Sequence, residues 1–328
     1  MNQSYSFNCR VTDLNQRIQK WLYSEELQNI VQVFGGEYPR SMSVSELAKW
    51  LENFSDRWDY RKYQAQAKDA KTGENARWKI SSADLTESQI SAVEKGISSL
   101  GLTGMDMPSE KSFDYIIALG GARFSCLYRP KYVYELLTRH NISARAAILL
   151  SGMRPIAESE RSATDSYAPD ALTEYDLINA GAEKAFERSP NFKEERYHHE
   201  NPNRSWAIRT YDTSDGQIPL FSLSGPSSQP DVRRANSADT YQFFLDKFHV
   251  EAGQRLLLVT SQIYVPYQQL EAQRTLAYPH RIYIETVGFP AEWSGRLQGM
   301  MEPANYLQEI RSTIQAINRF LDMSGIRE

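Results

Sequence analysis

Two carboxylates near predicted helix starts are the residues best suited to chemistry in this sequence. Glu174 stands near the start of "LTEYDLINAGAEKAF", and Asp239 lies in the first turn of "NSADTYQFFLDKF". Because general acid–base catalysis needs a carboxylate within hydrogen-bond reach of the reacting proton, two carboxylates in one crevice could act as acid and base or face a metal ion. We therefore predict Glu174 and Asp239 as catalytic residues, with Asn236 and Ser237 orienting the ligand. The alternative is that Asn236 or Ser237 only caps its helix.

Small and hydroxyl residues end four of the five most apolar runs of the chain. Backbone N–H groups approach a ligand closely where side chains are small, and a helix that follows such a turn directs its positive end to the same place. The pattern predicts a site for an anionic or nucleotide-like ligand; the alternative is that the glycines only make tight turns. The residues predicted to bind the ligand are Gly120, Gly121, Ala122, Arg123, Ser151, Gly152, Asn236, Ser237, Thr260 and Ser261.

Arginines near these turns could supply positive charge. Arg123 follows the glycine pair, and Arg233 and Arg234 precede the Asn236 segment. A guanidinium presents a planar fork that suits phosphate or carboxylate. The glycine pair does not complete the spaced dinucleotide fingerprint, so NAD is not predicted.

Other motifs indicate no further chemistry. His198, His199 and Glu200 are adjacent, and neighbouring residues of a strand face opposite ways, so they make a poor chelate and we predict no metal site. The sequence contains no nucleophile elbow, P-loop, zinc-ligand spacing or kinase signature.

Strand and helix patterns alternate over the part of the chain that must position these residues. Apolar runs buried on both faces are typical of parallel strands, and here helical stretches separate them. This order predicts an α/β fold with a Rossmann-like, doubly wound, mainly parallel sheet of at least five strands, with ligands beyond the carboxyl ends of the strands. The runs are 113–121, 146–152, 218–225, 255–261 and 281–289.

Helical patterns occupy the first region of the chain. Apolar residues recur at helical spacing over 12–34, where Thr12 or Asp13 could cap the start. Two later helices are preceded by capping boxes, and their apolar stripes predict core packing. The capping pairs are Ser43 with Glu46 and Thr86 with Gln89.

We predict three parts: an N-terminal helical region over 1–108, a Rossmann-like domain over 109–291, and a C-terminal helical segment over 292–328 that packs on that domain. The polar stretch 188–217 is long for a connection, and we interpret it as either a lid-like excursion or a flexible insert.

Composition narrows the function classes. The chain has 328 residues and a net charge of −4, so it carries no general attraction for nucleic acid or anionic membranes. The first residues lack the apolar core of a signal peptide, and no run approaches the ~18 apolar residues of a spanning helix. The two cysteines fit free buried thiols. We expect a cytoplasmic protein with a small-molecule partner.

The order of these motifs resembles a bacterial family of unknown-function domains that includes YdcF, SanA and ElyC. The shared pattern is a strand ending in glycines, a strand ending in Ser-Gly, an acidic helix start, a polar Asn-Ser segment and a Val-Thr-Ser strand end. Here the matching residues are Gly120-Gly121, Ser151-Gly152, Glu174, Asn236, Ser237, Asp239 and Val259-Thr260-Ser261.

The resemblance covers roughly residues 111–290 and is closest in character to the soluble YdcF branch. It implies a sheet that binds a nucleotide-like or phosphorylated small molecule, with S-adenosylmethionine as a candidate ligand. Tyr264 and Tyr267 stand where the family has His and Arg, which adds Tyr264 to the candidate ligand-binding residues.

Two functions therefore stand as hypotheses. The first is an enzyme that acts on a nucleotide or phosphorylated metabolite, with or without Mg²⁺. The second is a non-catalytic binding or regulatory protein for such a ligand, including S-adenosylmethionine or a related nucleoside. The sequence leaves the reaction and the oligomeric state open.

Overall fold

The computed structural model divides the chain into two compact units. One comprises residues 1–106, 262–279 and 290–328, and the other comprises 107–261 and 280–289. The residues that the structure describes are 5–9, 11–39, 41–63, 80–104, 107–187, 191–212, 218–289, 291–293 and 301–324.

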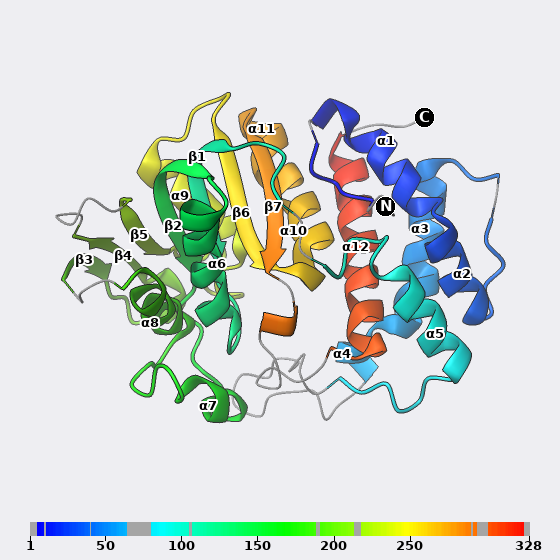
Figure 1. The fold of residues 1–328 in the computed structure, drawn as a ribbon, viewed down its shortest axis with the longest axis horizontal. Coiled ribbons are helices and arrows are strands. Elements are labelled where there is room, and N and C mark those ends of the chain that lie inside the picture. The colour runs from blue at the N-terminus through cyan, green and yellow to red at the C-terminus, as the bar shows by residue number, and fades with distance from the viewer. Residues whose placement is uncertain are drawn as a thin grey trace. The chain divides into compact units, whose positions relative to one another are not determined.

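The first unit is helical and is built around α12 (Pro303–Ser324), the long red helix in Figure 1. Helix α12 is buried along most of its length, and its stripe of Leu307, Ile310, Ile314 and Ile317 lies in one apolar core with the N-terminal helices. The N-terminal helices are α1 (Val11–Leu22), α2 (Glu25–Val33), α3 (Val44–Phe54), α4 (Tyr60–Tyr63) and α5 (Glu87–Gly96). The later ones are α10 (Val265–Ala272), a π-helical turn (Gln273–Ala277) and α11 (Tyr278–His280).

Local sequence sets the helix boundaries in this unit. Both predicted capping boxes are confirmed, at Ser43 and at Thr86. The helical pattern over 12–34 instead forms two helices, because the Ser24 hydroxyl accepts a hydrogen bond from Leu27 N and caps α2. Helix α1 begins at Val11, so Thr12 and Asp13 lie in its first turn rather than at the cap.

The second unit contains a seven-stranded sheet in the order β3-β4-β5-β2-β1-β6-β7. The five strands from β5 to β7 in this order are parallel to one another, which confirms the predicted Rossmann-like α/β fold. These strands are β1 (Ser112–Leu119), β2 (Ser143–Ser151), β5 (Leu220–Ser224), β6 (Arg255–Ser261) and β7 (Tyr283–Phe289).

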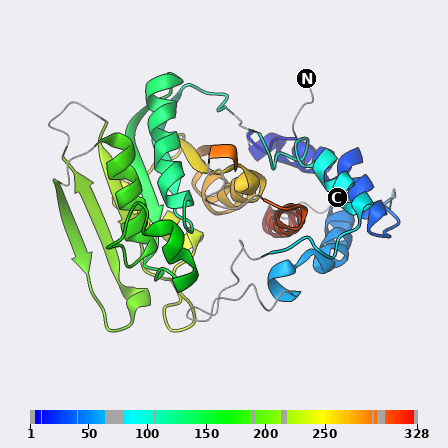
Figure 2. The same ribbon diagram turned by 60° about the horizontal axis from the view of Figure 1, so that its bottom comes forward.

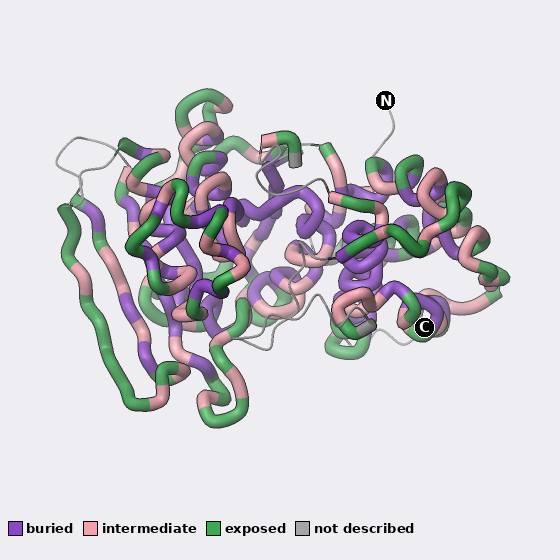
Figure 3. The backbone as a smooth tube through the Cα atoms, turned by 90° about the horizontal axis from the view of Figure 1, so that it is seen from below, coloured by how far each residue is buried: buried purple, intermediate pink, exposed green. Residues whose placement is uncertain are grey.

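Helices cover both faces of this sheet. Helices α6 (Ser125–Arg139) and α8 (Glu174–Phe186) pack side by side on one face, as Figure 2 shows, and α7 (Glu158–Thr164) lies between β2 and α8 in the chain. Phe248 of helix α9 (Ser237–Phe248) makes edge-to-face contacts with Tyr115 and Phe221, which point to the opposite face. The central strands are consequently buried along most of their length (Figure 3).

The polar stretch 188–217 contains a β-hairpin rather than a lid or a flexible insert. Strands β3 (Phe192–Tyr197) and β4 (Trp206–Tyr211) pair antiparallel, and β4 pairs antiparallel with β5. The backbone bonds of the sheet edge order these residues, although the strand β3 is mostly exposed and too polar to be recognised by its pattern. Residues 188–190 and 213–217 lie outside the described residues.

The unit boundaries also differ from the predicted regions. Residues 262–279 and the C-terminal segment belong to the helical unit, and α12 packs against α3 and α10 there. The sequence predicted that the C-terminal segment packs on the Rossmann-like domain, whereas α12 shares the apolar core of the helical unit. An amphipathic helix has a face that packs, but its sequence does not identify the partner. In the part of the chain that the structure describes, none of the helices combines the length and apolar character needed to cross a membrane.

Candidate functional site

The β1–α6 turn and the start of α8 meet at the carboxyl edge of the sheet. A Cβ atom on Gly120 would overlap both Oε1 of Glu174 and the backbone of Ser151, so these three residues are direct neighbours. Thr173 caps α8 and places Glu174 at its first position. Only glycine at 120 leaves room for the Glu174 carboxylate at this place.

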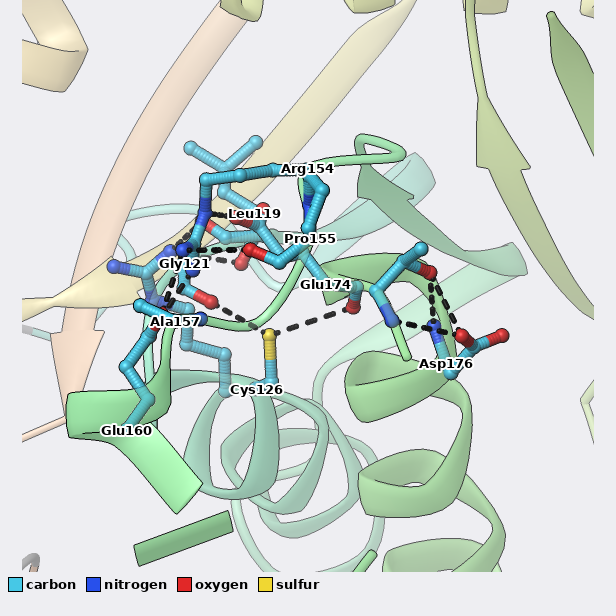
Figure 4. A network of polar contacts seen from close by, with 12 residues as sticks. Leu119, Gly121, Cys126, Arg154, Pro155, Ala157, Glu160, Glu174 and Asp176 are labelled. Atoms are coloured by element: carbon cyan, nitrogen blue, oxygen red, sulfur yellow. Dashed lines mark hydrogen bonds and ion pairs between the residues drawn. The ribbon is translucent and has the colours of Figure 1, made fainter. Parts of the chain in front are cut away.

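Arg154 joins two carboxylates beside this contact (Figure 4). Its guanidinium bonds both oxygens of Glu160, at 2.7 and 3.1 Å, and Oε2 of Glu174 at 3.2 Å. The Glu160 side chain is fully buried and also accepts from Ala157 N. Burial alone would lower the pKa of Arg154, but the hydrogen bonds and charges of Glu160 and Glu174 raise it above its usual value. The arginine is thus permanently charged and fully engaged.

One oxygen of Glu174 remains open. Oε2 accepts from Arg154, whereas no residue that the structure describes donates a hydrogen bond to Oε1. The Glu174 side chain is 14% exposed. Arg154 therefore fixes a partly exposed Glu174 side chain whose Oε1 lies next to Gly120.

A second arginine, Arg129, holds the β1–α6 turn through hydrogen bonds to its carbonyl groups. Arg129 of α6 donates to the carbonyl oxygens of Leu119, at 2.8 Å, and Gly120, and to the Ser261 hydroxyl at 3.3 Å. Next to it the Cys126 thiol donates to Gly121 O at 2.9 Å. Burial raises the pKa of Cys126, so the thiol stays protonated and acts as a packing group.

The turn itself contains backbone donors that are not used within the described structure. Gly121 and Ala122 are half-exposed, and their N–H groups find no acceptor among the residues that the structure describes. Helix α6 begins after Phe124 without a side-chain cap. Arg123 holds a left-handed backbone with φ of 51°, and its carbonyl accepts from Tyr167 Oη at 2.7 Å. The result is an uncapped helix start fixed in place by buried contacts.

Buried hydroxyls lie on the neighbouring strand ends. Ser151 and Ser224 are partners in the β2–β5 register, and Ser222 lies two residues earlier on the same face. Ser151 is 5% exposed, and Ser222 and Ser224 are fully buried. Within the described part of the chain, none of the three hydroxyl oxygens has a hydrogen-bond partner.

The start of α9 forms a separate cluster. The Asp239 carboxylate accepts from the guanidinium of Arg233, from Ser228 N and from Asn236 N, and Asn236 caps the helix in return. Burial alone would raise the pKa of Asp239, but the hydrogen bonds from Arg233 and Ser228 lower it to about 2. The sequence left capping open as the alternative here, and capping is the role that the structure shows for Asn236.

The structure thus brings part of the predicted site together and separates the rest. Gly120, Gly121, Ser151, Glu174 and Ser261 share one cluster on the α6 and α8 side. Thr260 precedes Ser261 and so points to the opposite face. Ser237 is exposed at the start of α9. Tyr264 belongs to the helical unit, whose apolar core it joins.

Sequence reasoning missed Arg154, Glu160 and Arg129. Arg154 lies three residues after the end of β2, and Glu160 lies in the short helix α7, which no apolar period announces. Arg129 sits in the predicted helix after β1, where a charged residue is expected to face solvent. It is instead 4% exposed, because the carbonyls at the end of β1 need a donor.

A hollow of about 440 Å³ opens at the other, amino-terminal edge of the sheet. Its charges are paired: Arg145 bonds Asp114 at 3.1 Å, and Asp114 also accepts from Arg255 N. The residues that line it are Ser112, Phe113, Asp114, Ser143, Ala144, Arg145 and Arg255.

Metal-ligating residues do not gather in the described part of the chain. No three His, Cys, Asp or Glu side chains there lie close enough together to hold an ion. His198 and His199 follow β3 and are exposed, and His199 Nδ1 accepts from Asn201 N.

Fold and site together define an α/β protein whose Rossmann-like unit is combined with a helical unit. The chain belongs to the Rv3785 family. It is 34% identical over 323 residues to the uncharacterized protein Rv3785 of Mycobacterium tuberculosis, covering 93% of this chain and 88% of that one. The match to uncharacterized protein Mb3814 of Mycobacterium bovis has the same identity and coverage. The family model of the Rv3785 N-terminal domain matches residues 7–101, and no solved structure matches the chain.

The resemblance to the YdcF, SanA and ElyC family is therefore wrong, and the suggestion of S-adenosylmethionine, which rested on it, falls with it. The misleading motifs have a physical origin. Tight turns after parallel strands select glycine and serine, and helix starts select Asn and Asp. Any doubly wound sheet repeats such short segments in the same order, so they do not distinguish one family from another.

Proposed function

We propose that this protein binds a small phosphorylated molecule at the carboxyl edge of its parallel sheet, with the phosphate at the β1–α6 turn. The observation that carries the proposal combines two features. Gly121 and Ala122 are partly exposed and their N–H groups find no acceptor among the described residues, and the buried Ser151 hydroxyl next to Gly120 has no hydrogen-bond partner there either. Buried polar groups are almost always hydrogen-bonded in folded proteins, so this edge calls for a polar partner.

The electrostatics of the turn favour an anion. The uncapped start of α6 carries the positive end of the helix dipole, and backbone N–H groups at such a start bind phosphate without side chains. Arg123 adds a cation in the turn. Burial lowers the pKa of Arg123 from its usual value, and the charge of Glu160 offsets only part of this lowering. A guanidinium remains charged over the whole physiological range.

An enzymatic role is the second candidate, and the open oxygen of Glu174 favours it. Arg154 fixes this carboxylate, and Oε1 faces the same edge as the turn. A carboxylate in this place could accept a proton from a ligand hydroxyl, as general base catalysis requires. If Glu174 accepts no proton from the ligand, the same residues would form the site of a non-catalytic binding protein.

A cytoplasmic location is part of the proposal. Cys9 and Cys126 are free thiols and both are buried, which a reducing compartment permits.

Calorimetric titration with inorganic phosphate and a panel of phosphorylated metabolites tests the proposal. We expect Arg123→Gln to weaken phosphate binding roughly tenfold, as the loss of a charge-assisted contact does. Arg145→Gln is the matched control, because it removes the same charge from the amino-terminal edge. Equal binding by both variants and the wild type would place any phosphate elsewhere. Turnover of the panel with and without Mg²⁺ then separates an enzyme from a binding protein.

A further inference from the structure

Resting on the proposed phosphate site, we infer that the rest of the ligand is a polyhydroxylated, sugar-like skeleton that Ser151, Ser224 and Glu174 recognise. Ser151 borders the phosphate turn, whereas Ser224 lies one strand further on. These residues offer hydrogen-bonding atoms at the ends of β2 and β5 and at the start of α8, and they indicate which kind of phosphorylated molecule fits.

The serines occupy positions where a parallel sheet normally carries aliphatic side chains. Strand β5 reads Leu-Phe-Ser-Leu-Ser, so its apolar residues Phe221 and Leu223 face α9 and its serines face α6 and α8. Ser224 lies beside Ser151 of β2. A buried hydroxyl without a hydrogen-bond partner lowers the stability of the fold by about 1–3 kcal/mol. Two such hydroxyls side by side therefore favour a role in binding over a role in stability.

Glu174 completes the set and limits the charge of what binds there. Its Oε1 neighbours Ser151 across Gly120. An ionised carboxylate only accepts hydrogen bonds, whereas each serine hydroxyl both donates and accepts. A row of ligand hydroxyls satisfies all three groups, while a second phosphate or carboxylate would be repelled by Glu174. Because the serine oxygens are buried, the ligand reaches them only when this edge opens locally.

The experiment compares inorganic phosphate with D-ribose 5-phosphate and D-glucose 6-phosphate by calorimetric titration of the full chain. We expect at least one sugar phosphate to bind tenfold or more tightly than phosphate. Ser224→Ala should reduce that preference roughly three- to tenfold, the range for one lost hydrogen bond, and leave phosphate affinity unchanged. Ser151→Ala should reduce the preference as well and also weaken phosphate binding, because Ser151 borders the phosphate turn. Thr260→Val is the matched control, because its fully buried, unpartnered hydroxyl points to the α9 face.

Thermal unfolding of the same variants provides an independent readout. Since none of these hydroxyls has a partner in the described structure, the alanine variants should melt at or above the wild-type temperature. Phosphate binding with no preference for either sugar phosphate, or a preference that both serine variants retain, overturns this inference and leaves the proposed function intact. Absence of binding by all three probes rejects the proposed function itself.

Discussion

The starts of α8 and α9 each pair an arginine with a carboxylate, and of these two only the start of α8 leaves hydrogen-bonding groups unfilled among the described residues. At α9 the Asp239 carboxylate receives hydrogen bonds from Arg233, Ser228 and Asn236 on both of its oxygens. At α8 the Glu174 carboxylate uses one oxygen for Arg154 and keeps the other open beside the Ser151 hydroxyl. The comparison shows that a carboxylate at a helix start usually serves the helix cap. It indicates a binding site only where one of its oxygens accepts no hydrogen bond from the protein.

The largest difference should come from breaking the two arginine contacts. Arg154→Gln leaves Glu160 charged in a fully buried position, and removing one partner of a buried ion pair typically costs about 3–5 kcal/mol. Arg233→Gln should cost less, because the Arg233 side chain is 32% exposed and Asp239 keeps its hydrogen bonds from Ser228 N and Asn236 N. Urea denaturation of both variants measures the difference.

A double variant tests the cause of that loss. Glu160→Gln added to Arg154→Gln removes the stranded charge, so it should recover part of the lost free energy of unfolding. If the double variant is as unstable as the sum of the two single changes, the pair is not coupled and the contrast between the clusters is wrong.

The second effect concerns the glycine that admits Glu174. Gly120→Ala places a Cβ against Glu174 Oε1 and Ser151, and such overpacking costs about 1–3 kcal/mol. Gly152→Ala is the control, because the nearest atom to its Cβ, Arg154 N, is 4.0 Å away. We expect a lower melting temperature for Gly120→Ala alone. Equal melting of the two variants would show that Glu174 does not occupy this place.

The third effect is a pH dependence that belongs to the α9 cluster. The pKa of Asp239 is lowered from 3.8 to about 2 in the folded state. The stability that this carboxylate contributes is thus fully present above its unfolded pKa and is lost as the pH falls from about 4 through about 2. Asp239→Asn should flatten the unfolding free energy across that window and leave ligand affinity at neutral pH unchanged. A loss of affinity in this variant would return Asp239 to the site.

The parallel sheet and several helix starts could be predicted from the sequence, because their signals are local and repeated. Each parallel strand is a continuous apolar run, and the capping residues at Ser43, Thr86 and Asn236 act on their own helix starts. The hairpin β3–β4 escaped recognition because its order comes from backbone pairing rather than from an apolar period: β4 pairs with β5, and β3 pairs with β4.

The candidate site was only half predictable for a similar reason. Glycines and hydroxyls at strand ends mark the edge, but whether a side chain is used up depends on contacts between distant residues. Arg154 reaches Glu174 twenty positions later, and Arg129 reaches the Ser261 hydroxyl from another part of the chain. No periodic pattern in the sequence predicts either contact. Asp239 and Glu174 therefore looked equally suited to catalysis until the structure showed their hydrogen-bond partners.

The smallest effect uses the two caps as a matched pair. Thr173 and Asn236 both form capping boxes, with Asp176 and Asp239 respectively. Replacing either cap by alanine should cost roughly 0.5–2 kcal/mol of stability. Only Thr173→Ala should also weaken binding of inorganic phosphate or a sugar phosphate, because Glu174 follows Thr173 directly and fraying of this first turn loosens its carboxylate above Gly120. Measured side by side, equal stability losses with an affinity loss confined to Thr173→Ala support the assignment of the site to α8. An affinity loss in Asn236→Ala alone would instead move the site to α9.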